Sequence, residues 1–373
     1  MATPRVDRPW IAGRMDAIRI SGIRQAFELA RTLPDPINLS IGSPDFDVPA
    51  PIRDAACSAI QAGANGYTIT QGIASLREAL LASIRRDYPR QERSLIVTSG
   101  TSGALMLSLL AVVDPGDEVV LFDPYFVLYP NLVILAGGTP VFVDTYPDFH
   151  IDCARVEAVL SPRTKVVLFN SPANPTGAVA SREEIRKLSQ LCHDRGILLI
   201  SDEIYRLFTH DEPFVSPAEF NDQVLVIDGF SKSHGMPGWR LGFAHGPPHL
   251  IEEMTKLQQF SFVCAPSMVQ HAGVVACQTD MSDQVSAYRR KRDRIYEGIK
   301  DCYDLPPPGG AFYLFPRAPG GDGAAFVQRA AKEKLIVIAG SVFSRRDTHF
   351  RLSYSADERT LDRGIEVLRR LAR

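Results

Sequence analysis

The sequence predicts an α/β protein with a mainly parallel, seven-stranded sheet that is flanked by helices, and with a second, smaller α+β domain built from both chain ends. The chain has 373 residues, which suits one large domain together with a smaller one. In its middle, short apolar runs alternate with amphipathic stretches, as in a parallel sheet covered by helices. The two ends do not follow this alternation. We expect an N-terminal arm and part of the smaller domain at 1–49, the large domain at 50–284 and the rest of the smaller domain at 285–373.

Several of the expected strands are rich in Val, Ile and Leu and lack a regular alternation of apolar and polar residues, which is typical of strands buried on both faces. The expected strands lie at 95–97, 118–122, 140–143, 165–169, 197–201, 224–228 and 241–245. Helical patterns lie between them. In one of these, Ser181 and Glu184 form the signature of a capping box, and Gly196 marks the end of the helix.

Both ends of the chain carry elements of the smaller domain. A helical pattern over 14–33 stops at Pro34. From about residue 285 the chain continues with a long charged helix, the segment PPPGGAFYLFP, a helix near 323–334, the short strand HFRLSYS and a final amphipathic helix from Asp357. We expect these two ends to meet in one domain.

Charge and composition exclude several classes of partner. The 41 Lys and Arg residues against 43 Asp and Glu residues give a formal net charge of −2, so no overall field favours nucleic acid or an anionic membrane. No apolar run approaches the length of a membrane span, and the segment MATPRVDRPW lacks the apolar core of a secretory signal. The six cysteines have neither metal nor disulfide spacing. We therefore expect a cytoplasmic protein without nucleic-acid, membrane or metal partners.

Several common catalytic motifs are missing from the sequence. No GxGxxG follows an expected strand, and no Gly-Lys pair could form a P-loop. There is no HExxH and no GxSxG. His245 and His249 are four residues apart, but Pro247 and Pro248 between them argue against a shared helical face.

Four polar segments follow strands, and ligands of open α/β sheets bind outside the carboxyl ends of the strands. The segments are TSGTSGAL, NSPANPTG, SDEIY and SKSHGMPGWR. Taken singly, each has an ordinary structural interpretation: Asp202 caps a helix, Asn174 starts a turn, Thr101 caps the next helix and Lys232 is a solvated lysine. Their occurrence together predicts that they converge on one site.

The segments SPANPTGAV, SDEIY and SKSHGMPGWRLGF resemble motifs of the class I/II aminotransferases, which are pyridoxal 5′-phosphate (PLP) enzymes of fold type I. The resemblance is closest to the aspartate-aminotransferase-like branch and extends from NLSIGSPDFDVP to FRLSYS. It implies PLP as the cofactor and a large domain that binds it. It also implies a small domain made from both chain ends, and a homodimer with active sites at the subunit interface.

The resemblance assigns the chemistry to three residues. Lys232 is expected to form the Schiff base with PLP, because burial and nearby cations lower the pKa of such an amine, and then to move the substrate proton. Asp202 is expected to keep the pyridine nitrogen protonated, so that the ring accepts electrons. Tyr205, together with Asn174, is expected to contact the cofactor oxygen O3′.

The resemblance also assigns residues to the phosphate, the ring and the substrate. The phosphate is expected to bind at a helix N-terminus and an arginine, with a tyrosine from the other subunit; these residues are Gly100, Thr101, Ser102, Gly103, Arg240 and Tyr67. Phe126 is favoured over Tyr125 as the aromatic ring stacked on the cofactor. Arg351 is expected to bind the substrate α-carboxylate through two parallel hydrogen bonds, and the backbone N–H of Gly42 to contact the same group.

One position departs from the family pattern. Many relatives have Ser or Thr three residues before the lysine, where this chain has Gly229. Ser231 is the alternative source of a hydroxyl for the phosphate. We expect the cofactor to be held somewhat differently at this point.

The predicted function is the transfer of the amino group of an L-amino acid to a 2-oxo acid by a ping-pong mechanism through Lys232. Another PLP reaction on the same fold, such as a C–S β-lyase, a decarboxylase or a racemase, remains an alternative, since the cofactor-binding residues do not separate these reactions. A non-catalytic module that senses PLP or an amino acid is a remote alternative. Such modules carry a fused DNA-binding domain, for which the segment before residue 50 is too short.

The sequence also suggests where substrate choice arises. Arg351 lies in HFRLSYS with the residues expected to face inward, although Phe350, Leu352 and Tyr354 would share the opposite face. The segments expected to contact the substrate side chain are Ile20-Ser21-Gly22 and FSFVCAPS from Phe260. Neither offers a cation for a distal carboxylate. Uncharged or aromatic amino acids are therefore expected to react at least as well as aspartate.

Overall fold

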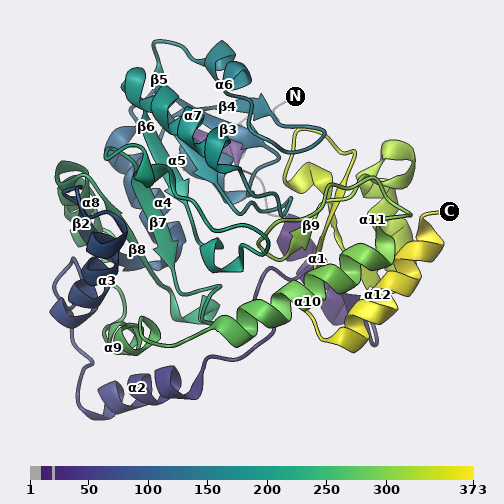
Figure 1. Cartoon of the computed structure of the whole chain (residues 1–373), viewed down its shortest axis with the longest axis horizontal. Coiled ribbons are helices and arrows are strands. Elements are labelled where there is room, and N and C mark those ends of the chain that lie inside the picture. Colours follow the sequence, from purple (N-terminus) through teal and green to yellow (C-terminus); the bar gives the residue numbers. More distant parts are fainter. Residues whose placement is uncertain (1–9, 19–21) are drawn as a thin grey trace.

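The structure, a computed structural model that describes residues 10–18 and 22–373, is built around a seven-stranded sheet (Figure 1). The strand order is β2-β8-β7-β6-β5-β3-β4, and β8 alone runs against the other six. This confirms the predicted mainly parallel sheet of seven strands. The strands are β2 (Ser94–Ser99), β3 (Glu118–Asp123), β4 (Thr139–Asp144), β5 (Thr164–Asn170), β6 (Leu198–Asp202), β7 (Leu225–Gly229) and β8 (Leu241–Gly246).

Helices cover both faces of this sheet because successive residues of each strand point to opposite sides. In β3, Val119 and Leu121 face one hydrophobic core while Val120 faces another. The first core is closed by α4 (Gly100–Val112), α5 (Leu128–Leu135) and α8 (Pro248–Gln259). The second is closed by α2 (Ala50–Gln61), α3 (Ala74–Asp87), α6 (Cys153–Val159), α7 (Arg182–Asp194) and α9 (Ser267–Ala276).

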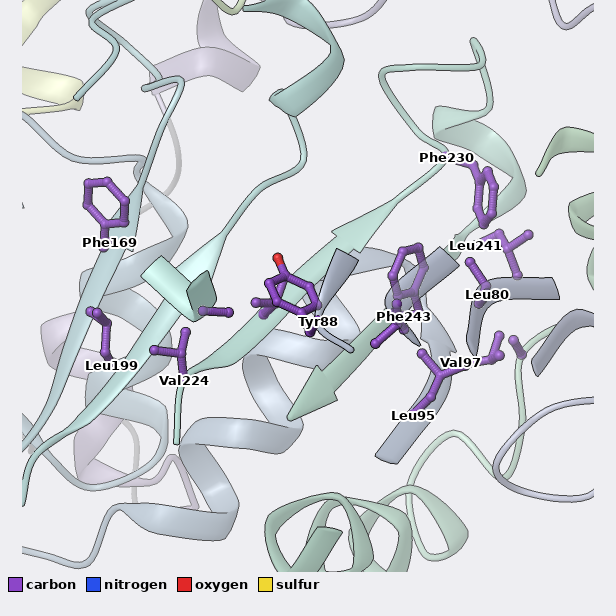
Figure 2. Close-up of a cluster of buried hydrophobic side chains, with 14 of the residues drawn as sticks. Leu80, Tyr88, Leu95, Val97, Phe169, Leu199, Val224, Phe230, Leu241 and Phe243 are labelled. Atoms are coloured by element: carbon purple, nitrogen blue, oxygen red, sulfur yellow. The ribbon is translucent and has the colours of Figure 1, made fainter. Parts of the chain in front are cut away.

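The core beneath α3 and α9 extends across the whole sheet, from β2 to β4, and Figure 2 shows part of it. Leu80 of α3 belongs to the same cluster as Val97 of β2, Phe243 of β8 and Phe169 of β5. Burying each such side chain stabilises the fold by about 1.5–3 kcal/mol. This rigid support fixes the ends of the central strands, where the polar segments begin.

A further core joins the two ends of the chain. β1 (Ile37–Asn38) pairs in parallel with β10 (Leu335–Ile336). Ile37 and Leu39 share a buried cluster with C-terminal residues, and α10 and α12 lie side by side (Figure 1). The remaining elements here are α1 (Gly22–Thr32), α10 (Ser282–Ile299), α11 (Gly323–Lys332), α12 (Glu358–Leu371), β9 (Tyr313–Leu314), β11 (Ile338–Ala339) and β12 (Phe350–Ser353). The boundary proposed between 284 and 285 falls within α10, and the division into domains stays a proposal.

Short 3₁₀ helices complete the described chain. They are Gly13–Ala17, Arg206–Phe208, Pro217–Glu219, Pro237–Trp239, Pro319–Gly321 and Gly340–Val342. The expected helix over 14–33 is wrong as a single element, because Ile18 is extended (φ −95°, ψ 125°) and separates Gly13–Ala17 from α1. Most of MATPRVDRPW, and Ile20 and Ser21 of the expected substrate segment, lie outside the described residues.

The structure confirms the helix predicted between β5 and β6, which is α7, and the signals at both of its ends. Ser181 Oγ accepts a hydrogen bond from the Glu184 backbone N–H, and Glu184 Oε2 accepts one from the Ser181 backbone N–H. Gly196 follows the helix with φ 61°, a left-handed conformation that glycine adopts without a steric penalty. Across residues 10–18 and 22–373, none of the helices combines the length and apolar character needed to cross a bilayer.

Candidate active site

The four polar segments meet around a cavity of about 300 Å³ at the carboxyl edge of the parallel strands. Because β8 runs antiparallel, the loop that leaves β7 and enters β8 lies at the same edge, which explains why SKSHGMPGWR reaches this cavity. Of the residues predicted for the site, eleven line the cavity: Gly42, Thr101, Ser102, Phe126, Asn174, Asp202, Tyr205, Ser231, Lys232, Arg240 and Arg351. The first turn of α4 contributes Thr101 and Ser102 next to the end of β2.

Lys232 projects from the loop after β7, and its Nζ donates a hydrogen bond to the backbone oxygen of Gly42. Removal from water, together with the charges of Arg351 and Arg240, lowers the pKa of this amine to about 8 against the opposing effect of Asp202. About a tenth of such amines are neutral at pH 7, compared with fewer than one in a thousand for a solvated lysine. Lys232 is therefore not a solvated surface lysine.

Asp202 ends β6 with its side chain only 3% exposed. Its Oδ2 accepts a hydrogen bond of 2.9 Å from Tyr129 Oη, and its Oδ1 accepts a longer one of 3.3 Å from the Ile204 backbone N–H. Burial raises the pKa of this carboxyl to about 6, against the effect of these hydrogen bonds and of Lys232. Asp202 is therefore mostly ionised at neutral pH and places a buried negative charge opposite the cations of the cavity.

Arg351 lies in β12, the middle strand of a three-stranded antiparallel sheet, and is 1% exposed. Both faces of β12 are buried, which resolves how Arg351 can face the cavity while Phe350 and Leu352 face the core. The guanidinium carbon lies 4.5 Å from the ring centre of Tyr313 and 4.4 Å from that of Phe343. Aromatic faces attract a cation at this distance, so the two rings hold the guanidinium plane in place.

Arg351 does not use all the hydrogen-bond donors of its guanidinium. Nη1 donates to Asn174 Oδ1 at 3.0 Å and Nη2 donates to the backbone oxygen of Ser40 at 2.9 Å. Within the described chain, Nε is buried without a hydrogen-bond partner. A buried N–H without a partner is unfavourable, and a planar anion such as a carboxylate would supply the missing hydrogen bond. The guanidinium of Arg351 is therefore suited to bind such an anion.

Tyr205 and Tyr313 lie on the same side of the cavity, with their hydroxyl oxygens 2.9 Å apart. Burial raises the pKa of Tyr205 well above its ordinary value, so its phenol keeps its proton. Gly42 lies close to this pair, because a Cβ atom built on Gly42 would come within 2.8 Å of Tyr313 Oη. Gly42, Tyr205 and Tyr313 thus form one wall of the cavity.

Arg240 lines the cavity next to the start of α4, where Gly100 packs against its guanidinium. Arg240 Nη1 donates to the backbone oxygen of Pro237 at 2.9 Å, which orients the guanidinium. Gly100 has φ 69°, and a Cβ atom there would lie 2.4 Å from Arg240 Nη2. Glycine is therefore required for the guanidinium to approach the first turn of α4. Unpaired backbone N–H groups at a helix start, next to an arginine, form a site for an anion such as phosphate.

Gly229 is explained by the approach of two strands. It pairs with Gly242 of β8, and a Cβ atom on Gly229 would lie 2.9 Å from the Gly242 Cα atom and 3.0 Å from the backbone oxygen of Leu241. A larger residue would force β7 and β8 apart. Ser231 lines the cavity and remains the nearby candidate for a hydroxyl contact.

Three predicted residues do not line the cavity within one subunit. Gly100 lies beside Arg240 at the start of α4, and Gly103 follows Ser102 directly but is buried inside α4. Tyr67 is 88% exposed and lies outside the lining. The choice of Phe126 over Tyr125 agrees with their positions, because Phe126 lines the cavity while the Tyr125 ring packs against Phe142.

Sequence reasoning missed four residues that hold predicted ones in place: Ser40, Tyr129, Tyr313 and Phe343. Tyr129 had one usable signal, since it follows Phe126 by three residues, a spacing that brings side chains together at the start of a helix. The others come from segments far away in sequence, and their contacts depend on tertiary packing. The parts of the chain that are described contain no group of three His, Cys, Asp or Glu side chains arranged to hold a metal ion.

The fold and this cavity define a class of enzyme: an α/β protein with a lysine amine of lowered pKa, a buried carboxylate and two arginines at the carboxyl edge of its sheet. Residues 34–368 match the model of the family described as aminotransferase class I and II. The chain is a member of the class I and II aminotransferases, and it is therefore an enzyme that transfers amino groups and uses PLP.

Individual relatives agree with this family. The chain is 35% identical to the probable aspartate aminotransferase of Methanocaldococcus jannaschii, over 97% of this chain and 99% of that protein. It is 31% identical to aromatic-amino-acid aminotransferase 2 of Thermococcus litoralis, over 96% and 98% of the two chains. The crystal structure of aspartate aminotransferase from Thermotoga maritima matches with a TM-score of 0.92 and 33% identity, over 96% of this chain and 99% of that one.

The residues of the cavity fit PLP. Its phosphate needs an anion site, which Arg240 and the start of α4 offer around Gly100, where a Cβ atom would fill the space. Its ring nitrogen needs a carboxylate, which Asp202 offers, and its aldehyde needs an amine, which Lys232 offers. A cavity of about 300 Å³ lies at the lower end of the usual range for small-molecule sites.

Proposed function

We propose that this enzyme moves the amino group of an L-amino acid to a 2-oxo acid in two successive half-reactions at the cavity around Lys232. The observation that carries this proposal is that Lys232, Asp202 and Arg351 face one cavity. They combine an amine of lowered pKa, a buried carboxylate and a guanidinium with an unpaired N–H. These are the groups needed to move a proton, to stabilise a cationic ring and to bind an α-carboxylate.

The residues around the cavity divide into those that would hold the cofactor and those that would hold the substrate. Those for the cofactor are Gly100, Thr101, Ser102, Phe126, Asn174, Asp202, Tyr205, Ser231, Lys232 and Arg240, with Tyr67 from a neighbouring subunit. Arg351, Asn174 and Gly42 would hold the substrate. When bound, PLP supplies an acceptor for the electron pair left on the substrate α-carbon.

Lys232 is the base that we propose for the substrate α-proton. Only a neutral amine can accept a proton, and the lowered pKa of Lys232 provides that form near neutral pH. Asp202 Oδ1 would hold a proton at the ring nitrogen. Arg351 would fix the α-carboxylate, while Tyr313 and Phe343 hold its guanidinium plane so that little ordering is needed when substrate arrives.

We propose that amino acids with uncharged or aromatic side chains react at least as fast as amino acids with acidic side chains. Among the described residues that line the cavity, the lysines and arginines are Lys232, Arg240 and Arg351, and each already has a proposed partner. Ile23 and Ile41 give the lining an apolar part. By their names, two of the relatives above act on aspartate and one acts on aromatic amino acids.

A half-reaction screen tests both the reaction and its substrate. The PLP-loaded enzyme is mixed with single L-amino acids, and the loss of its cofactor absorbance is followed over time. We expect phenylalanine, methionine and alanine to react at least as fast as aspartate, and a 2-oxo acid to restore the absorbance. A hundredfold preference for aspartate would contradict the proposed side-chain specificity. Failure of every 2-oxo acid to restore the absorbance would contradict transamination by this site.

Arg351→Leu is predicted to lower kcat/KM by at least about tenfold for every amino donor, since a charge-assisted hydrogen bond contributes roughly 1.5–3 kcal/mol. The effect should be the same for all donors because they share the α-carboxylate. Steady-state kinetics with several donors measures it. Arg186→Leu, which removes an exposed arginine on α7, is the control and should leave kcat/KM unchanged. A loss confined to one donor would instead assign Arg351 to side-chain recognition.

We further propose that the active unit is a homodimer. Tyr67 is 88% exposed in the single subunit, although a phosphate-binding role requires it to be enclosed. Ile69, nearby in sequence, is 57% exposed, so the segment presents apolar surface as well. A second subunit that covers this segment would bring Tyr67 to its own cavity. A cytoplasmic location is also proposed, supported by six cysteines that are all free thiols.

Mixing two inactive or weakened variants tests whether the site is shared. After subunit exchange between Lys232→Ala and Tyr67→Phe, a hybrid dimer has one site with both residues intact, so activity should rise above that of Tyr67→Phe alone. The control mixes Lys232→Ala with Asp202→Ala. Both of these residues line the cavity of one subunit, so no hybrid regains an intact site. If activity does not rise above that of Tyr67→Phe alone, Tyr67 does not serve the neighbouring cavity.

A further inference from the structure

Tyr129 is a buried phenol whose hydroxyl is directed at Asp202. It lies in the first turn of α5 and is 4% exposed. Its ring packs edge-on against Phe126, with ring centres 5.5 Å apart, and its Oη donates to Asp202 Oδ2 at 2.9 Å. The proposed ring-stacking residue, just before α5, thus packs on a hydrogen-bond donor to the proposed acid in the first turn of that helix.

The two oxygens of Asp202 are engaged unequally. Oδ2 accepts the hydrogen bond from Tyr129, whereas Oδ1 accepts only the longer bond from the Ile204 backbone N–H. The backbone oxygen of Asp202 accepts a bond of 2.8 Å from Asn170 Nδ2, which fixes the main chain at this point. A carboxylate oxygen can accept two hydrogen bonds. Oδ1 therefore keeps the capacity to accept a proton donor from a ligand.

We propose that Tyr129 is a positioning residue that locks the Asp202 carboxylate, keeps it ionised and reserves Oδ1 for the ligand. This inference rests on the role proposed above for Asp202 and adds a residue outside the predicted set. Tyr129 acts through Asp202 and takes no proton from substrate.

The charges around Asp202 show why the phenol matters. Facing it are Tyr129 from α5, Tyr205 from the loop after β6, Asp228 from β7 and Lys232 from the loop after β7. Burial and Asp228 raise the pKa of Asp202, while Tyr129 and Lys232 lower it. The pKa of Tyr129 itself is raised well above its ordinary value, so the phenol remains a donor. Removing its hydroxyl should therefore raise the pKa of Asp202.

The experiment is an infrared titration of the full-length protein freed of PLP, which does not depend on turnover. The band of Asp202 is identified by its loss in Asp202→Asn. In Tyr129→Phe, we expect the midpoint of that band to move up by at least one pH unit, a tenfold change in proton affinity. Tyr146→Phe is the matched control, because it removes a buried phenol that donates at the same 2.9 Å, but to Ser344. Its Asp202 band should titrate as in the unchanged protein.

A second replacement keeps the test valid if Tyr129→Phe does not fold. Placing 3,5-difluorotyrosine at position 129 makes the phenol a stronger donor without removing it, so the midpoint of Asp202 should move down. Unchanged midpoints in whichever of these proteins folds would overturn the inference, as would an equal shift in Tyr146→Phe. The screen with amino acids can still succeed in that case, so failure of this inference is distinct from failure of the proposed function.

Discussion

Lys232→Ala is expected to bring transamination below detection while the protein stays folded. Loss of a general acid–base group alone typically costs 10²–10⁴-fold in rate, and this variant also loses the amine that would hold the cofactor. The fold should survive, because the side chain makes one hydrogen bond, to Gly42, and belongs to none of the buried hydrophobic clusters. Steady-state transamination assays and a far-UV circular dichroism spectrum measure the two outcomes.

Borohydride reduction and peptide mapping then identify the amine itself. Reduction fixes the cofactor to the lysine that holds it, and we expect the label on the peptide that contains Lys232. Lys187→Ala, which removes an exposed lysine on α7, is the control and should retain full activity and labelling. A label on any other lysine would rule out Lys232 as the attachment site.

Asp202→Ala is expected to slow α-proton removal by several orders of magnitude while PLP still binds. The loss of one preorganised electrostatic partner typically costs at least about 10²–10³ in rate. Here the partner is a buried carboxylate that is already ionised near neutral pH, so little reorganisation accompanies the reaction. Single-turnover kinetics of the PLP-loaded enzyme with an excess of amino acid measures the step directly.

A second buried carboxylate provides the comparison for this variant. Asp123 also ends a parallel strand, is 6% exposed and lies outside the cavity around Lys232. Asp123→Asn should change the single-turnover rate by less than about tenfold, since it touches none of the reacting groups. If Asp202→Ala were as fast as Asp123→Asn, Asp202 would have no part in the chemistry.

The order of strands and helices could be predicted because it depends on local patterns. All seven expected strands are present, and the capping box at Ser181 is formed, since apolar runs and caps act over a few residues. The position of the cavity could also be predicted from the sequence. Polar residues that follow parallel strands must share one edge of the sheet, so Asp202 and Lys232 come together whatever the details of packing.

What the sequence could not predict depends on contacts between distant segments. The ring of Phe343 stacks on Arg351, and the backbone oxygen of Ser40 accepts a hydrogen bond from Arg351. No sequence pattern indicates that these three residues meet. The helix expected over 14–33 failed for a different reason: its apolar periodicity says nothing about the extended conformation of Ile18. Exposure of Tyr67 could not be inferred either, because it depends on which surfaces of one subunit remain uncovered.

The parallel pairing of β1 with β10 has a consequence for how the protein is made. Ile37 is made about 300 residues before its partner Leu335, an interval on the order of 15–60 s at usual rates of synthesis. During that interval the segment around Ile37 and Leu39 has no core to enter, whereas the strands β2 to β8 are already complete. The central sheet can therefore fold before Leu335 is made, and the segment around Ile37 and Leu39 lacks its partner strand until then.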